Sequence, residues 1–201
     1  MNKKEVIINY GLNNKQSQLI QFYLTRLNEI NKSLNLVGQS TIKNAWDRHI
    51  NDSLQLTRFI KNKKSSIIDL GTGAGLPGLV LNIYGYKNIL LVDSKLKKIN
   101  FIKDFSKDYK LEIKNLCSRV ENIKGQKFDY VVCRAFAPLP KILDYSLIFT
   151  KKNTSLLFLK GRNVKKEIQD AKIHFSFQHK LFESKSAGEG FVLMVTKLKR
   201  K

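Results

Sequence analysis

The spacing of apolar residues divides the chain into two unlike parts. Between about residue 14 and residue 60, apolar side chains recur every three or four positions, as on one face of a helix. A polar stretch at residues 31–35 interrupts this pattern, and a second helix is expected to begin near residue 41. Ser40 or Thr41 is the expected N-cap of that helix. The first part of the chain therefore predicts a helical unit.

Beyond the basic run at residues 61–64, short apolar runs alternate with helical stretches. The expected strands are 66–70, 89–93, 111–115, 130–133, 156–159, 174–182 and 191–198. The expected helices are 79–84, 95–109, 139–150 and 164–172. Alternating strands and helices predict a parallel sheet covered by helices on both faces. The last two strands, joined by residues 184–190, predict an antiparallel pair at one edge of the sheet.

A glycine-rich string follows the first expected strand and runs from Asp69 to Gly78 with the sequence DLGTGAGLPG. Glycines there allow a sharp turn and allow a ligand to approach the amide groups closely. Gly73, Gly75 and Gly78 fit the pattern G-x-G-x-x-G, and Asp93 ends the next strand at the distance where an acid binds ribose hydroxyls. S-adenosylmethionine, a dinucleotide and a purely structural glycine turn all remain open on this pattern.

The charge of Asp69 favours S-adenosylmethionine among these alternatives. A carboxylate near the turn repels a pyrophosphate but attracts an ammonium and a sulfonium group. Seven strands with an antiparallel ending also predict the Rossmann-like α/β fold of S-adenosylmethionine-dependent methyltransferases, a mostly parallel sheet with an antiparallel last strand. Asp93 would then hold ribose or cap the following helix. In this fold the turn with Val120 and Glu121 lines the adenine end of the pocket, although Glu121 also fits a plain surface position.

The length of 201 residues suits a single domain. We expect residues 1–62 to form an N-terminal helical extension and residues 63–201 to form a Rossmann-like catalytic core.

The fourth expected strand runs into the sequence RAFAP, residues 134–138. Methyltransferases that act on exocyclic amines usually carry Asp or Asn followed by Pro-Pro and an aromatic residue here. This chain lacks that motif, which argues against methylation of an exocyclic amine. Methylation of pyrimidine C5 needs a cysteine nucleophile, but Cys133 lies inside the strand and lacks the usual preceding proline. A guanine N7 has an in-plane lone pair and no proton, so its methylation needs alignment rather than a general base. Phe136 is expected either to stack on such a purine or to pack in the protein.

Charge indicates the class of partner. The chain has 37 basic and 16 acidic residues, a net charge of +21. Such a charge favours a nucleic acid, with an anionic membrane surface or simple solubility as alternatives. Lys160, Arg162, Lys165 and Lys166 are candidate RNA contacts, although a lysine run also forms an ordinary solvated face.

We expect a cytoplasmic protein with no membrane partner, because no apolar run fits a bilayer span or a signal peptide. The two cysteines have no partners at metal-ligand spacing, so we expect no metal.

Seven short motifs are spread in order over nearly the whole chain. They are Asn35-Leu36-Val37-Gly38, Arg48-His49-Ile50-x-Asp52-Ser53-Leu54, Gly71 to Gly78, Asp93-Ser94-x-x-Lys97-Lys98, Ser118-Arg119-Val120-Glu121, Arg134-Ala135-Phe136-Ala137 and Leu159-Lys160-Gly161. In this order and at these distances, the sequence resembles the glucose-inhibited division protein B family. Those proteins are bacterial methyltransferases that modify N7 of a guanine in 16S ribosomal RNA. The family's usual Arg before the last strand is absent, because this chain has Gly190-Phe191 there.

The resemblance implies that Gly71, Leu76, Val120, Glu121 and Arg134 contact S-adenosylmethionine. The assignment of Arg134 rests on the family alone.

It also implies that a helix with Arg48, His49, Asp52 and Ser53 faces the mouth of the active site. At spacing i, i+4, Arg48 and Asp52 are able to pair on one helical face. Without the family, a plain helix surface is the default interpretation of this segment. Arg48, His49, Asp52 and Phe136 are therefore substrate-side candidates, and no residue is assigned as a catalytic base.

The implied partner is 16S ribosomal RNA or the small ribosomal subunit, and nothing in the sequence requires more than a monomer. Two other functions remain open: a non-catalytic RNA-binding protein on a methyltransferase scaffold, and a small-molecule methyltransferase or oxidoreductase. The intact glycine string and Asp93 argue against the first. The high positive charge is unexplained by the second.

Overall fold

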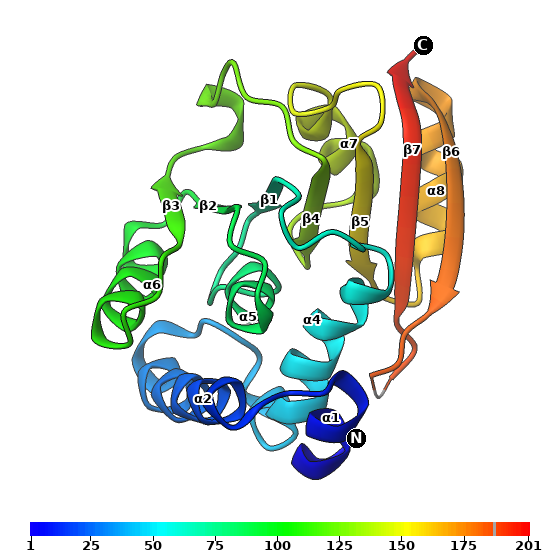
Figure 1. The fold of residues 1–201 in the computed structure, drawn as a ribbon. Coiled ribbons are helices and arrows are strands. Elements are labelled where there is room, and N and C mark those ends of the chain that lie inside the picture. The colour runs from blue at the N-terminus through cyan, green and yellow to red at the C-terminus, as the bar shows by residue number, and fades with distance from the viewer. Residues whose placement is uncertain (187) are drawn as a thin grey trace.

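A computed structural model describes residues 1–186 and 188–201 and has three layers, with helices on both faces of a central sheet (Figure 1). The seven strands lie in the order β3-β2-β1-β4-β5-β7-β6. Their bounds are β1 Ile67–Leu70, β2 Ile89–Asp93, β3 Lys114–Cys117, β4 Tyr130–Arg134, β5 Ser155–Lys160, β6 Phe175–Glu183 and β7 Phe191–Arg200. In the sheet described, β7 alone runs opposite to the other strands, which confirms the predicted fold class.

Helices connect the strands and precede them. The N-terminal part contains α1 (Lys3–Tyr10), α2 (Asn14–Leu34), α3 (Gln39–Ile42), a π-helix (Trp46–Asn51), α4 (Asp52–Leu54) and a 3-10 helix (Gln55–Arg58). The remainder contains α5 (Gly78–Tyr84), α6 (Leu96–Asp108), a 3-10 turn (Val120–Asn122), α7 (Leu139–Leu147) and α8 (Val164–His174). No helix in residues 1–186 and 188–201 is long and apolar enough to cross a bilayer.

Two hydrophobic cores form because the strands are buried on both faces. Successive strand residues point to opposite faces, so Ile67 packs with the N-terminal helices, α5 and α6, whereas Ile68 packs with α7 and α8. Leu157 and Phe158 divide in the same way. The N-terminal helices share a continuous core with the sheet, and the proposed division at residue 62 stays a prediction.

The N-terminal part departs most from the sequence prediction. The expected N-cap at Ser40 or Thr41 is wrong, because α3 begins after Gly38 and has no side-chain cap. The polar stretch at residues 31–35 was expected to interrupt the helix, but α2 continues to Leu34. Asn35 ends the helix in a left-handed conformation. Helix α1 was not expected, because Val6 is its only buried side chain.

The sheet departs from the prediction at its edge. Strand β3 pairs with β2 through residues 114–117, three positions later than expected. Leu111 and Ile113 suggested the earlier start, but they pack against the core cluster of α5 and α6 before the ladder begins. At the other edge, β7 inserts between β5 and β6, and the connecting loop 184–190 includes Ala187, which lies outside the described residues.

The order of strands creates a switch between β1 and β4. The chain proceeds from β1 outward to β3 and then returns to β4 on the other side of β1. Helices after β1 and β4 consequently cover opposite faces, and the loops that leave the two strands diverge. Ligands of open α/β sheets bind at such a point, outside the carboxyl ends of the strands.

Candidate functional site

The loop after β1 relies on backbone conformations that favour glycine. Gly71, Gly73 and Gly75 all have positive φ angles, of 67°, 58° and 97°. A Cβ on Gly71 would overlap with the ring of Phe136, which lies directly against this glycine. The sequence prediction of a tight turn is confirmed, and Gly71 is the glycine at which the turn meets the β4–α7 loop.

Asp69 holds this loop from beneath. Its Oδ2 accepts hydrogen bonds from Thr72 Oγ1 at 2.6 Å and from the backbone N–H of Gly78 at 2.9 Å. Its Oδ1 is buried and has no hydrogen-bond partner among the described residues. Complete burial raises the pKa of the carboxyl to about 7, although both hydrogen bonds oppose this shift. Asp69 therefore shapes the loop and does not line the adjacent cavity.

Asp93, at the end of β2, joins the glycine loop to the next turn. One carboxylate oxygen accepts from the N–H of Gly73 at 3.0 Å, and the other accepts from the N–H of Lys95 at 2.9 Å. Lys98 Nζ lies 3.6 Å from the same carboxylate. The alternative prediction that Asp93 is the N-cap of the following helix is wrong, because Lys95 is the N-cap of α6 and makes no side-chain cap. Each carboxylate oxygen has a second lone pair, so Asp93 keeps acceptor capacity for a ligand.

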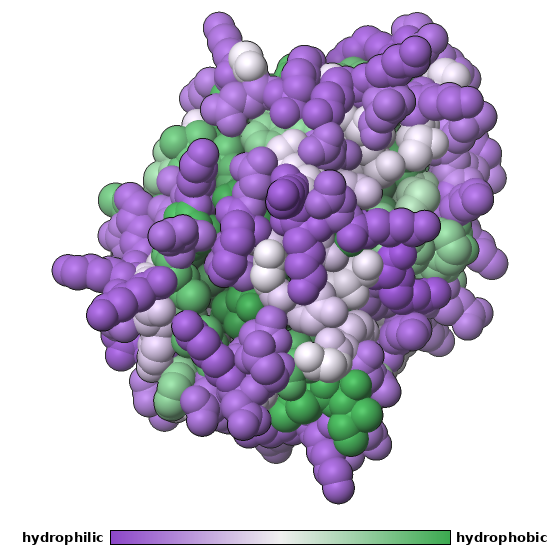
Figure 2. All heavy atoms as spheres, in the orientation of Figure 1, coloured by the Kyte–Doolittle hydropathy of each residue, from purple (hydrophilic) through white to green (hydrophobic). Residues whose placement is uncertain are grey.

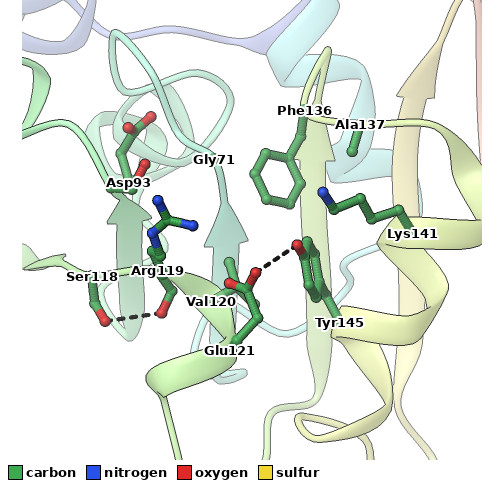
Figure 3. Close-up of a pocket in the computed structure, with 11 residues that line it drawn as sticks. Gly71, Asp93, Ser118, Arg119, Val120, Glu121, Phe136, Ala137, Lys141 and Tyr145 are labelled. Atoms are coloured by element: carbon green, nitrogen blue, oxygen red, sulfur yellow. Dashed lines mark hydrogen bonds between the residues drawn. The ribbon is translucent and has the colours of Figure 1, made fainter.

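A cavity of about 270 Å³ opens between the ends of β1, β2 and β4 (Figure 3). On one side of it, Tyr145 of α7 donates a hydrogen bond of 2.7 Å to Glu121 Oε1. Hydrogen bonds from its own backbone N–H and from Tyr145 lower the pKa of Glu121. The lining residues are Gly71, Asp93, Ser94, Ser118, Arg119, Val120, Glu121, Phe136, Ala137, Lys141 and Tyr145. We call this space the Gly71 cavity.

Ala135 separates the Gly71 cavity from a second one. Its φ of 47° is unusual for a residue with a Cβ and turns the chain sharply after β4. Phe136 consequently lines the Gly71 cavity, whereas Arg134 lines a neighbouring space of about 330 Å³. That second space, here the Arg134 cavity, is also bordered by Arg48, Asp52 and Lys160.

His49 and Arg134 form a buried contact between the N-terminal part and β4. Arg134 Nη2 lies 2.9 Å from His49 Nδ1, and His49 Nε2 lies 3.0 Å from Thr41 Oγ1. Because a guanidinium only donates, Nδ1 must accept, and the ring proton is on Nε2. Burial and the charge of Arg134 lower the pKa of His49 to about 3. The histidine is therefore neutral and its lone pair is occupied, which argues against a role as general base.

Asp52 completes this network on the other side of Arg134. Its Oδ2 lies 3.4 Å from Arg134 Nη1, while Gln55 Nε2 and Ser186 Oγ donate to its Oδ1 at 2.8 and 3.1 Å. Burial raises the pKa of Asp52, and the charge of Arg134 opposes the rise. The contact with Ser186 also ties α4 to the β6–β7 loop. We call His49, Asp52 and Arg134 the His49 network.

Lys160 forms an ion pair within the protein. Its ammonium group lies 2.6 Å from Glu167 Oε2 and donates to the carbonyl of Ala137 at 3.2 Å. Glu167 Oε2 also accepts from the N–H of Leu139 at 2.7 Å. The side chain of Lys160 is 9% exposed and its charge is paired, which argues against a direct RNA contact there, although that contact stays a prediction. The pair instead clamps both sides of the turn at Pro138. Arg162, Lys165 and Lys166 are exposed, and their RNA contacts stay predictions.

The predicted site residues fall into three groups. Gly71, Asp93, Val120, Glu121 and Phe136 meet in the Gly71 cavity. Arg48, Asp52 and Arg134 meet in the Arg134 cavity, with His49 buried behind them. Besides His49, the predicted residues that line neither cavity are Asp69, Gly73, Gly75 and Leu76.

Two further residues named by the resemblance lie outside the Gly71 cavity. Arg134 lines the Arg134 cavity, and its contact with S-adenosylmethionine stays a prediction. Ser53 is buried and donates to the carbonyl of His49 at 2.7 Å, so it stabilises the helix rather than facing the mouth.

The sequence reasoning missed two side chains of α7. Lys141 and Tyr145 both line the Gly71 cavity. Their spacing of i, i+4 places them on one helical face, directly after the RAFAP motif. A search for a polar and aromatic pair on the first helix after that motif would have identified them.

The comparisons with known proteins agree with this geometry. Residues 16–190 match the family model described as rRNA small subunit methyltransferase G. The ribosomal RNA small subunit methyltransferase G of Orientia tsutsugamushi (strain Ikeda) is 38% identical over 190 residues, which are 94% of each chain. The protein of that name from Rickettsia prowazekii (strain Madrid E) is 37% identical over 186 residues, 91% of this chain and 96% of its own. Among solved structures, a SAM-dependent methyltransferase from Aquifex aeolicus has a TM-score of 0.58 at 14% identity and covers 75% of this chain and 91% of its own, a likeness of fold.

Proposed function

The chain belongs to the rRNA small subunit methyltransferase G family, and we propose that it methylates N7 of a guanine in 16S ribosomal RNA with S-adenosylmethionine as methyl donor. The observation that carries this proposal is the Gly71 cavity at the switch between β1 and β4. It lies beside the end of β4, where neither His49 nor Cys133 is suited to act as a general base.

The Gly71 cavity fits the donor chemically. Asp93 offers free acceptor lone pairs at the end of β2, where ribose hydroxyls are expected. Val120 supplies a buried apolar surface for the adenine ring, and Glu121 stands beside it in the position where the resemblance implies a contact. Gly71 keeps the loop free of a side chain, so that its backbone can approach the ligand. When bound, S-adenosylmethionine supplies an electrophilic methyl group on a sulfonium.

The residues around β4 support attack by a nucleophile that needs no deprotonation. His49 is neutral, and its lone pair accepts from Arg134. Cys133 is buried, and burial raises the pKa of its thiol, so a thiolate nucleophile is disfavoured. A guanine N7 requires only alignment with the methyl carbon and sulfur, which is catalysis by proximity and orientation. Phe136 and Arg134 line the two cavities on either side of Ala135, and we propose that they hold the target base in line.

The substrate is proposed to enter from the side of the Arg134 cavity. Arg48 and Arg134 line it and suit an RNA segment with its phosphates. In this arrangement Arg134 acts at the boundary between donor and target rather than in the adenosine pocket. The proposal also retains the sequence predictions of a cytoplasmic monomer that uses no metal.

A methylation assay tests the proposal. The purified chain is incubated with labelled S-adenosylmethionine and small ribosomal subunits from a strain that lacks the corresponding gene, and modified RNA is cleaved chemically at N7-methylguanine. We expect label in 16S RNA and one new cleavage site. Asp93→Asn serves as a comparison and should mainly weaken donor binding.

Two results would contradict the proposal. Binding of RNA with no heat on addition of S-adenosylmethionine would indicate a non-catalytic RNA-binding protein. Methylation of free nucleotides without stimulation by ribosomal RNA would indicate a small-molecule enzyme.

A further inference from the structure

A basic surface lies at the end of the sheet opposite the Gly71 and Arg134 cavities. A groove of about 750 Å³ runs between the α7–β5 connection and the paired strands β6 and β7. It is lined by thirteen residues, of which four are lysines and none is acidic. The lysines are Lys151, Lys152, Lys197 and Lys199. We call this surface the lysine groove.

The groove is well separated from the Gly71 and Arg134 cavities. Lys160, at the carboxyl end of β5, pairs with Phe191 at the start of β7, whereas the groove contains residues 196–199 near the other end of β7 (Figure 1). Residues 196–199 lie five to eight positions beyond Phe191 on β7, which corresponds to roughly 17–27 Å at about 3.4 Å per residue. A ligand that occupies both regions must therefore be a macromolecule.

Three of the four lysines keep their charge available. Lys151 lies 2.7 Å from Asp129 Oδ1, which partly neutralises it. Lys152, Lys197 and Lys199 are exposed, and none is within ion-pair distance of a carboxylate in the part of the chain that the structure describes. Unpaired like charges around one groove repel one another, and a bound polyanion relieves that repulsion.

The backbone at Lys197 gives a second, independent indication. Lys197 has a φ of 52° inside β7, at a bulge where the pairing shifts between Ser176 and Gln178. This conformation costs a residue with a Cβ roughly 1–2 kcal/mol relative to glycine, and glycine is the usual residue at such a bulge. Strain of this kind is retained at functional positions. The bulge directs a lysine, rather than a glycine, toward the groove.

An aromatic ring completes the surface. Phe177 is half-buried, lines the groove and lies opposite the bulge. Proteins that bind single-stranded nucleic acid combine a basic groove for the backbone with aromatic rings for the bases. We propose that the lysine groove binds a single-stranded segment of the substrate RNA, remote from the target guanine. This inference rests on the proposed function, since it assigns a docking surface for the same substrate.

The test measures how RNA binding depends on salt. The variant K152Q/K197Q/K199Q removes three charges from the groove, and K103Q/K107Q/K110Q removes three from α6 and its end, beyond the other edge of the sheet. Lys110 is a matched control for Lys197, because it also has a φ of 52°, but at a helix end where this conformation is common. Binding of small subunits is followed over a range of salt concentrations, together with KM, kcat and the affinity for S-adenosylmethionine.

Each phosphate contact in single strands contributes about 0.7 to the slope of log affinity against log salt. The groove variant should therefore lower the slope by about 2 and raise KM for subunits roughly tenfold, with unchanged kcat and donor affinity. Equal changes in the groove and α6 variants would overturn the inference. So would loss of binding to vesicles of anionic lipid with intact RNA binding. If wild-type protein binds subunits without methylating them, the proposed function fails. The salt slopes of the two variants still show whether the lysine groove binds RNA.

Two single variants sharpen the result. Lys197→Gly removes the charge and the strain together, so RNA affinity should fall while Tm stays level or rises. A fall in Tm with unchanged affinity would make the bulge purely structural. Phe177→Leu keeps the apolar volume but removes the stacking surface, and it should weaken RNA binding with no change in the salt slope. Unchanged binding by Phe177→Leu would contradict the stacking role.

Discussion

The glycine loop (residues 69–78) and the His49 network lie side by side at the carboxyl edge of the sheet, yet they are built in different ways. The loop is continuous in sequence and is held by backbone groups, with Asp69 bonded to residues three and nine positions away. The network joins His49 to Arg134 across 85 positions and consists of ionisable side chains. The loop is therefore sensitive to side-chain volume, whereas the network is sensitive to charge.

The two regions also respond to pH in opposite directions. The pKa of Asp69 is raised to about 7, so its protonated form is favoured in the folded protein. Its contribution to stability is complete below about pH 4 and is lost as the pH rises toward 7. The pKa of His49 is lowered to about 3, so its contribution is complete above about pH 6.5 and is lost as the pH falls toward 3. The site as a whole is thus best supported at intermediate pH.

The largest effect is expected from breaking the network at Arg134. Arg134→Met leaves Asp52 without its cationic partner in a mostly buried position and leaves His49 Nδ1 without a donor. Removal of one partner of a buried ion pair costs about 3 kcal/mol or more. Urea denaturation should show this loss in the free energy of unfolding. Arg134→Met combined with Asp52→Asn should recover part of it, and a loss below about 1 kcal/mol would show that the network carries little stability.

The next effect tests whether the loop is limited by volume. Gly71→Ala introduces a Cβ at a φ of 67° and against the ring of Phe136. Backbone strain and overlap together should cost about 2–3 kcal/mol of stability and weaken donor binding measured by calorimetry. Gly73→Ala is the matched control, because its φ is 58° but its Cβ would meet only Gly71 O at 3.9 Å. Equal losses in the two variants would mean that the contact with Phe136 is unimportant.

The opposite pH responses are tested by Asp69→Asn. Asparagine mimics the protonated carboxyl and is still able to accept from Gly78 N–H. Between pH 5 and pH 8 the stability of wild type should fall relative to that of Asp69→Asn by roughly 2 kcal/mol, since only the wild type must release a buried proton. Denaturation series at several pH values measure the difference. A constant difference across this range would show that Asp69 ionises with an ordinary pKa.

The smallest effect is expected at the rim of the network. Thr41→Val removes the hydroxyl that accepts from His49 Nε2 and leaves a buried N–H without a partner. The expected loss in the free energy of unfolding is about 1 kcal/mol. The affinity for the methyl donor should not change, because Thr41 lines neither cavity. Calorimetry and denaturation on the same sample check both parts. Weaker donor binding would show that the network and the loop are coupled.

Surface character separates the regions further. Hydrophilic side chains dominate the face shown in Figure 2, and exposed apolar residues form small separate areas on it. On such a surface, a basic side chain is not by itself evidence of an RNA contact. Lys160 is an example, because the sequence made it a plausible RNA contact whereas its ammonium group forms an ion pair with Glu167.

Much of the fold was predictable because its signals are local. Strands buried on both faces appear as short apolar runs, and β1, β2, β4 and β5 begin and end within one or two residues of their predicted positions. The segment 39–58 was not predictable in detail. It contains α, π and 3-10 turns in succession, and its conformation depends on bonds to Arg134 and to the β6–β7 loop.

The sequence by itself determined the glycine loop, because a positive φ and close backbone approach leave few residue types suitable at those positions. It also determined the position of Asp93, because the apolar pattern of β2 shows that this acid ends the strand. Only the tertiary structure decided that Asp69 supports the loop from below, that Arg134 and Phe136 line different cavities, and that Lys160 pairs with Glu167. Those outcomes depend on which distant residues meet each side chain. Burial, pairing and hydrogen bonding are properties of the assembled fold and leave no periodic signal in the chain.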